Sequence, residues 1–339
     1  MISRTSVMTY KSVRKPLPQI ARELNVDAVV EGSVLRSGDR VRITAQLIRV
    51  PGEMHVWAQS YNENVRDTLA LQSRVTRDIA EQIQVALKEQ ATVVPEKSAP
   101  VNQEAYEDYL KGRYFWNKRS GDGLRKSIEY FNRAIEKDPN YARAYAGLAD
   151  AYALSGDWEY GILPPEDAFS KAKTAAEKAL ALDNSLSEAH TSLGFALELY
   201  AWDWDAAEKE YQRALSLNPS YATAHHWYAW HLIMMQRIDE GLLELRKAES
   251  LDPLSLIIGA DLADALCIAH LYDASLQQSQ KMLDLDPTFA VAHYQRGQAF
   301  EQKQMHEQAI AEFRKAIELS GHSAVFDSNL AYAYAISGH

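Results

Sequence analysis

The sequence predicts a small α/β segment followed by a long all-α solenoid of repeated helical pairs. In the last two-thirds of the chain, short turn-forming dipeptides recur at a nearly constant interval of about 34 residues, the first interval being longer than the others. In the first ninety residues, apolar and polar side chains instead alternate with the period of two that is typical of a β-strand. The dipeptides are Asp138-Pro139, Asp183-Asn184, Asn218-Pro219, Asp252-Pro253 and Asp286-Pro287, with Ser320-Gly321 in the sixth place.

The first elements alternate between helix and strand. Apolar residues at helical spacing over 17–24 follow Pro16, a residue favoured in the first turn of a helix. A strand is expected over 28–35, then a turn at Ser37-Gly38-Asp39 and a second strand over 41–49. Its alternation predicts an antiparallel strand with one solvent-facing side. The residues of its apolar face are Val41, Ile43, Ala45 and Leu47.

After the turn Pro51-Gly52, a third strand is expected over 55–61. A long helix should then begin at Asp67 and cover the sheet with an apolar stripe in which every fourth position is apolar. That stripe consists of Leu71, Val75, Ile79, Ile83 and Leu87. Residues 91–103 contain two prolines and no periodicity, so we interpret them as a linker between an α/β domain, 1–90, and a solenoid, 104–339.

Each turn dipeptide of the solenoid ends one helical pair and precedes the next, because proline removes a backbone N–H and restricts the residue before it. The second helix of each pair carries a small residue where two helices must approach closely: Ala134, Ala179, Ala214, Ala248 and Ala316. An aromatic residue or leucine stands three positions earlier in four of these helices: Phe131, Tyr211, Leu245 and Phe313. Met282 occupies the alanine place of the fifth pair and departs from the rule.

Composition narrows the class of protein. No apolar run approaches the roughly 18 residues that span a bilayer, and the N-terminus lacks the apolar core of a signal peptide. The single cysteine, Cys267, excludes an intrachain disulfide. Residues 1–95 hold 13 Lys and Arg against 10 Asp and Glu, whereas the rest holds 23 against 36. An acidic solenoid repels phosphate backbones, so we expect no nucleic-acid binding through it.

The solenoid resembles the tetratricopeptide repeat (TPR) family over about residues 104–339. The resemblance implies a right-handed α-solenoid of helix-turn-helix units whose curvature creates a groove for a protein or peptide partner. By this alignment the chain contains about six repeats and one extra helix over 324–337. The second repeat carries an excess of eleven residues around 161–165, and Trp202-Asp203-Trp204 replaces the usual turn of the third.

The first segment resembles the C-terminal part of a TolB N-terminal-like domain. The similar stretches are Arg4-Thr5-Ser6, Val26 to Val34, Val41 to Leu47 and Val56-Trp57-Ala58. In that family a further strand and helix come earlier, and here the chain also stops after a first repeat helix. We therefore expect a fragment of a longer protein. The combination resembles the region downstream of an output domain in bacterial CadC-like winged-helix regulators, cyclases and Ser/Thr kinases.

Catalytic and cofactor motifs do not occur in the sequence. It has neither GxGxxG nor GxxxxGK[ST], so we expect no nucleotide cofactor, and a GxSxG elbow for Ser/His/Asp catalysis is also missing. No two histidines have the i, i+4 spacing of helical zinc ligands. His190, His225 and His293 share the fourth position of a repeat with Tyr145, so we interpret them as packing substitutes for an aromatic ring. We expect no enzyme and no metal.

The predicted groove is the best candidate site. In TPR proteins, positions 2, 5, 9, 12 and 13 of each first helix line the concave surface. The resemblance carries these over to fourteen candidate residues, which we call the predicted groove residues: Arg143, Asp150, Glu188, Thr191, Phe195, Leu199, His226, Trp230, Ile233, Met234, Asp264, Ile268, Tyr294 and Gln298. One arginine and no lysine or asparagine argue against the carboxylate clamp of chaperone-binding TPRs. Aromatic and methionine residues are typical of interface anchors. Alternatively, neighbouring helices or the α/β domain cover them.

The sequence thus predicts a non-catalytic interaction module that captures a peptide or helix, with an acidic rim favouring basic partners. Two alternatives stay open: a signalling cyclase or kinase whose catalytic part lies upstream, and a self-associating structural protein. We expect the cytoplasm, or the extracytoplasmic side of the inner membrane if an upstream segment spans it.

Overall fold

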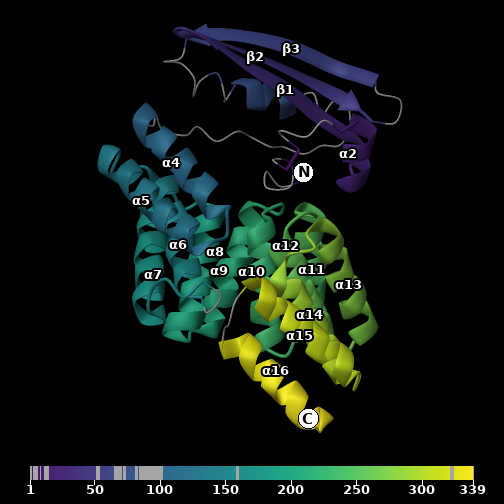
Figure 1. The fold of residues 1–339 in the computed structure, drawn as a ribbon. Coiled ribbons are helices and arrows are strands. Elements are labelled where there is room, and N and C mark those ends of the chain that lie inside the picture. The colour runs from purple at the N-terminus through teal and green to yellow at the C-terminus, as the bar shows by residue number, and fades with distance from the viewer. Residues whose placement is uncertain are drawn as a thin grey trace.

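Figure 1 shows the computed structural model, which describes residues 15–50, 54–64, 74–80, 102–157, 160–320 and 324–338 together with residues 2, 7, 9, 10, 71 and 83. The predicted linker lies outside the described residues except for its last two positions, 102 and 103, and so do the turn at Pro51-Gly52 and Leu87.

The first segment contains the predicted helix and three strands. Helix α2 (Leu17–Glu23) precedes β1 (Ala28–Ser37), β2 (Arg40–Arg49) and β3 (Met54–Asn64), which form an antiparallel sheet in the order β1-β2-β3. The β1–β2 turn is tight because Gly38 adopts a φ of +59°, a conformation that costs glycine little. On β2 the alternation holds: Val41, Ala45 and Leu47 are buried. A register shift between Leu47 and Ile48 buries Ile48 as well.

Helical residues 74–80 follow the sheet. Leu71 is fully buried and packs with Val41 and Tyr61, and Val75 packs beside them. The Tyr61 hydroxyl donates a hydrogen bond to Asp78 Oδ2 over 2.8 Å. The predicted apolar stripe therefore does cover one side of the sheet at these positions.

From residue 102 onward the described chain is helical, as predicted. The helices are α4 (Gln103–Trp116), α5 (Gly121–Lys137), α6 (Ala142–Ser155), α7 (Pro165–Leu182), α8 (Ser187–Ala196), α9 (Trp204–Leu217), α10 (Ala222–Met234), α11 (Ile238–Leu251), α12 (Leu256–Ile268), α13 (Tyr272–Leu285), α14 (Ala290–Gln302), α15 (His306–Ser320) and α16 (Ala324–Ser337). Consecutive helices pack against each other along the array, and Figure 1 shows them as a stack running from the teal α5–α7 to the yellow α16.

The predicted packing positions form the core. The five alanines of the second helices and their aromatic or leucine partners are all fully buried. Met282 is also fully buried, and the structure explains its departure from the rule. A Cβ added at Gly259 on the facing helix α12 would lie 2.0 Å from Met282 Sδ. The fifth repeat thus places the small residue on its first helix and the large one on its second.

The turns between paired helices share one backbone feature. Trp202, Gln236, His270 and Gln304 all have φ between 56° and 63°, the left-handed conformation that ends many helices. They recur at an interval of 34 residues. The third repeat is one residue longer, and a π-helical turn, Leu197–Ala201, lies between α8 and Trp202. Because a π-turn accommodates one additional residue in a helix, it keeps the following turn in phase.

Candidate functional site

The predicted groove residues differ in how far they reach the surface. Asp150, Thr191, His226, Ile233 and Tyr294 are buried. Glu188, Phe195, Leu199, Trp230, Asp264 and Gln298 are half-buried. Arg143, Met234 and Ile268 are exposed. The five buried residues are part of the solenoid interior in this structure, so a partner would reach them only after local rearrangement.

The aromatic residues expected to anchor a partner make internal contacts instead. The Phe195 ring lies 5.8 Å from Phe169 and 4.6 Å from Trp227, measured between ring centroids. Trp230 Nε1 donates a hydrogen bond to Asp261 Oδ2 over 3.0 Å. Both rings therefore pack against their own chain but stay half-buried, and a role in anchoring a partner stays a prediction.

A buried ion pair joins the first helices of the first three repeats. Arg113 Nη1 on α4 donates to Asp150 Oδ2 on α6 over 2.6 Å, and Ser192 Oγ on α8 donates to the other carboxylate oxygen. Asp150 is fully buried, and this burial raises the pKa of its carboxyl although the Arg113 charge opposes the shift. A buried pair of this kind fixes the positions of the helices that carry it.

The histidines at the fourth position of a repeat have a polar role that sequence reasoning missed. The Nδ1 atoms of His190, His225 and His293 each lie within hydrogen-bond distance of a glutamate on the second helix of the same repeat, and their Nε2 atoms face a carbonyl oxygen six positions earlier. The glutamates are Glu210, Glu244 and Glu312, and the carbonyl oxygens belong to Asn184, Pro219 and Pro287. Each imidazole therefore ties its turn to its paired helix. The nearly constant spacing from each histidine to its glutamate was the signal that could have revealed this.

The π-helical turn holds a second polar cluster. Glu198 is buried and accepts hydrogen bonds of 3.2 Å from the Tyr211 hydroxyl and from His231 Nδ1. On the other side of His231, Glu208 Oε1 accepts a hydrogen bond of 2.6 Å from Arg237 Nη1. These contacts connect the third repeat to the fourth.

Acceptor groups gather between α12 and α14, two first helices that contact each other. We call Asp264, Tyr294, Gln298 and Glu301 the acidic cluster. In the described part of the chain, Asp264 has no hydrogen-bond or salt-bridge partner. Burial, reinforced by the charge of Asp261, raises its pKa to about 6. Glu301 is only 8% exposed. Among the described residues, its Oε1 atom, Gln298 Oε1 and the Nδ1 atom of His306, which acts on Glu301, have no hydrogen-bond partner.

Three exposed apolar residues occupy equivalent positions of successive first helices. Met234 and Ile268 are 43% and 40% exposed and occupy the same position of consecutive repeats. Met234 and Ile268 each stand two residues before the left-handed residue of their turn. In the third repeat, which contains the π-turn, the residue two positions before Trp202 is Tyr200, and it is 39% exposed. The sequence alignment had assigned Leu199 there, because it did not account for the additional residue. We call Tyr200, Met234 and Ile268 the apolar row.

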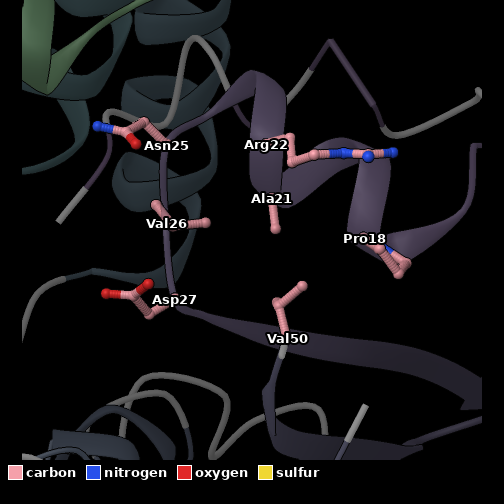
Figure 2. Close-up of a pocket in the computed structure, with 7 residues that line it drawn as sticks. All are labelled: Pro18, Ala21, Arg22, Asn25, Val26, Asp27 and Val50. Carbon is pink, nitrogen blue, oxygen red and sulfur yellow. The ribbon is translucent and has the colours of Figure 1, made fainter. Parts of the chain in front are cut away.

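A shallow hollow of about 360 Å³ lies in the first segment, between α2 and the ends of the sheet. Figure 2 shows Ala21 and Val50 pointing toward each other across it, whereas Asn25 and Asp27 point away. Its remaining lining residues are Pro18, Arg22 and Val26. This lining contains no nucleophile beside a base, so the hollow offers no arrangement for covalent catalysis.

Among the described residues, no helix combines the length and the apolar character needed to cross a membrane.

Comparison with known proteins identifies the repeats. Models of the tetratricopeptide repeat match residues 130–162, 197–255 and 290–322, so these three stretches of the solenoid are tetratricopeptide repeats. The crystal structure of the APC/C hetero-tetramer Cut9-Hcn1 matches 68% of this chain and 42% of that chain with a TM-score of 0.54 at 16% identity. This match confirms the solenoid fold.

Two bacterial relatives share part of the sequence. "Putative adenylate cyclase 3" of Rhizobium meliloti is 32% identical over 200 residues, which are 58% of this chain and 33% of that protein. Transcriptional regulator HilA of Salmonella typhimurium is 26% identical over 151 residues, 44% of this chain and 27% of that protein. The chain thus spans a third or less of the length of these two relatives. The resemblance of the first segment to a TolB N-terminal-like domain stays a prediction.

Proposed function

We propose that this chain is a non-catalytic interaction module that binds a peptide segment of a partner protein along the first helices of repeats three to six. TPR repeats support binding of a protein partner. The observation that carries the proposal is the apolar row, whose Ile268 lies one helical turn after Asp264 of the acidic cluster. Three successive repeats each expose an apolar side chain at the same position, and exposed apolar residues that recur on one surface mark interaction sites more often than isolated ones do.

We infer further that the module belongs to a bacterial signalling or transcription-regulatory protein. The similarity to a cyclase-type protein and to a transcriptional regulator supports this role. Each similarity covers only a third or less of the relative. A second candidate, favoured by the cyclase similarity, is that the chain is the non-catalytic part of a larger enzyme. Peptide binding by the repeats is compatible with both.

A phage-displayed peptide library selected on the purified chain tests the binding role. Peptides enriched on the wild-type chain should lose at least tenfold in affinity on a variant with Met234→Ser and Ile268→Ser, because truncating two central contacts removes most of an apolar interface. The matched control is Leu243→Ser on α11, which removes a side chain that is 68% exposed outside the apolar row. If no peptide is enriched, or both variants bind equally well, the proposed site is wrong.

Substitution of the inner rings would be a poorer test. Phe195→Ala and Trp230→Ala remove rings that pack within the solenoid, so a loss of binding could reflect a loss of folding. The exposed apolar row avoids that ambiguity.

A further inference from the structure

We propose that the first helical pair of the solenoid, α4 and α5, presents a basic surface that binds an acidic segment of a partner protein. This pair stands at one end of the stack (Figure 1). The surface lies outside the apolar row, so the inference goes beyond the proposed function and does not depend on it. We call its central residues the basic aromatic face: Tyr114, Phe115, Lys118, Lys126 and Tyr130.

The first argument is that positive charge is concentrated on this one pair of helices. Residues 111–133 contain seven Lys and Arg against two Asp and Glu, whereas the other residues of 96–339 contain 16 against 34. The first repeat is therefore basic in an array that is otherwise acidic. A terminal repeat needs a polar outer face for solubility. Acidic or paired side chains would supply that equally well, so solubility does not explain the excess of one sign.

The second argument is that two lysines of this surface contact aromatic rings and no carboxylate. The ammonium groups of Lys118 and Lys126 each lie 5.3 Å from the centroid of the Phe115 ring, and that of Lys118 also lies 4.9 Å from the Tyr114 centroid. These are cation–π distances. Both lysines are exposed, and in the described part of the chain neither side chain has a hydrogen-bond or salt-bridge partner. Because both ammonium groups lie near one ring, two carboxylates of one short segment can reach them together.

Neighbouring cations of the same helices differ from these two lysines. Lys111 and Arg133 also lie over a ring, that of Tyr130, but both contact the Asp108 carboxylate. Their charges therefore have an acidic neighbour within the chain. The charges of the two lysines beside Phe115 stay available to a partner.

The third argument is that the rings give the lysines a fixed base. The Phe115 ring stacks on Tyr130 with 5.5 Å between centroids and 5° between planes, and Tyr114 meets Phe115 edge-on at 5.2 Å. The stack joins α4 to α5, so both helices determine where the ammonium groups lie. Cations that are already placed lose less side-chain entropy when a partner binds. Tyr114 is 56% exposed and offers an apolar contact beside the two charges.

An acidic protein segment fits this surface better than a nucleic acid does. Single-stranded nucleic acids stack their bases on free aromatic faces, and here lysine ammonium groups already lie over the Phe115 and Tyr114 rings. The exposed carboxylates of Asp122 and Glu129 would repel a continuous phosphate backbone. A peptide can instead place single carboxylates at the lysines and an apolar side chain on Tyr114. The partner chemistry is therefore a short run of Asp or Glu residues that flank an apolar residue.

The experiment is a fluorescence-anisotropy titration of the purified chain with a dye-labelled peptide, Glu-Glu-Phe-Glu-Glu. The matched probe is Gln-Gln-Phe-Gln-Gln with the same dye, which keeps the shape and removes the charge. We expect the glutamate peptide to bind at least tenfold more tightly, and its affinity to fall as salt is added. The double variant Lys118→Gln, Lys126→Gln should weaken its binding at least fivefold, because two ion pairs are lost. The double variant Lys118→Arg, Lys126→Arg should retain it.

The matched control is the double variant Lys171→Gln, Lys178→Gln on α7. It removes the same charge from two exposed lysines, one of which also lies over a ring, with Lys171 Nζ 5.8 Å from the Tyr152 centroid. Binding of the glutamate peptide should change less than twofold in this control. Circular dichroism verifies that all variants are folded, as expected for exposed side chains.

Several results would overturn the inference. They are equal binding of the two peptides, no binding of either, or a control that loses as much affinity as the Lys118 and Lys126 variant. Tighter binding of a short oligothymidylate through the same lysines would assign the surface to nucleic acid and would also overturn it. The double variant Met234→Ser, Ile268→Ser should bind the glutamate peptide as the wild-type chain does. A loss there would place the peptide on the apolar row, so failure of this inference is distinguishable from failure of the proposed function.

Discussion

Asp264→Asn is expected to stabilise the protein near neutral pH and to leave it unchanged in acid. Burial and the charge of Asp261 raise the pKa of Asp264 from its ordinary value of 3.8 to about 6. Two pKa units correspond to ~3 kcal/mol of unfavourable free energy for the ionised form. Asparagine resembles the neutral carboxyl in size and polarity and carries no charge at any pH. We therefore expect the variant to gain up to ~3 kcal/mol at about pH 7.5.

The direction of the pH dependence follows from proton binding. Because the pKa in the folded state lies above that in the unfolded state, the folded chain binds more protons between about pH 4 and about pH 6. The contribution of Asp264 to the free energy of unfolding therefore falls as pH rises through this window. In the asparagine variant this contribution does not change with pH. Urea unfolding followed by far-UV circular dichroism measures the difference. Because repeat arrays can unfold in segments, hydrogen exchange of α12 to α14 is the companion measurement.

The matched control for this prediction is Glu136→Gln, which neutralises an exposed carboxylate on α5. It should change the free energy of unfolding by less than ~0.5 kcal/mol at either pH. Our reasoning is refuted if Asp264→Asn has the same effect at about pH 4 and about pH 7.5, or if it destabilises the chain at the higher pH.

Three further predictions concern the packing of the solenoid, and all are measured by urea unfolding. Gly259→Ala and Met282→Ala should each destabilise the chain, Met282→Ala by about 2–5 kcal/mol. The double variant should lose about 1–3 kcal/mol less free energy of unfolding than the two single losses added together. Simple additivity would show that the two residues do not share one space. Arg113→Met should cost about 3–5 kcal/mol because it leaves Asp150 buried without its cation, and a loss below ~1 kcal/mol would contradict the buried pair. Gln236→Gly should stabilise by about 0.5–1 kcal/mol by removing a side chain from a left-handed turn, whereas Gln236→Ala, which keeps that strain, should give no gain.

Helix ends and core positions could be predicted from the sequence because both depend on local chemistry. A helix ends before each Asx-Pro pair whatever surrounds it, and a small residue facing a large one repeats with each pair. The exception in the fifth repeat was visible at Met282. The compensating glycine, Gly259, could not be predicted from the sequence, because its role depends on which residue of the facing helix meets the methionine side chain.

The site was harder to predict because exposure depends on neighbouring repeats. Counting positions along each first helix identified Met234, Ile268 and Asp264 correctly as surface or partly exposed residues. It could not show that Asp261 of the next repeat pairs with His226, or that Phe326 packs on Tyr294 with ring centroids 4.8 Å apart. The unpartnered acceptors of the acidic cluster likewise emerge only when α12 and α14 are placed side by side.

The exchange of sizes between Gly259 and Met282 limits how such an array can diversify by gene duplication. A crossover that moves the whole fifth unit carries both residues together and preserves their fit. A crossover between its two helices would set a glycine opposite an alanine, or a methionine opposite a histidine. Related proteins with this array should therefore inherit both helices of the fifth repeat together.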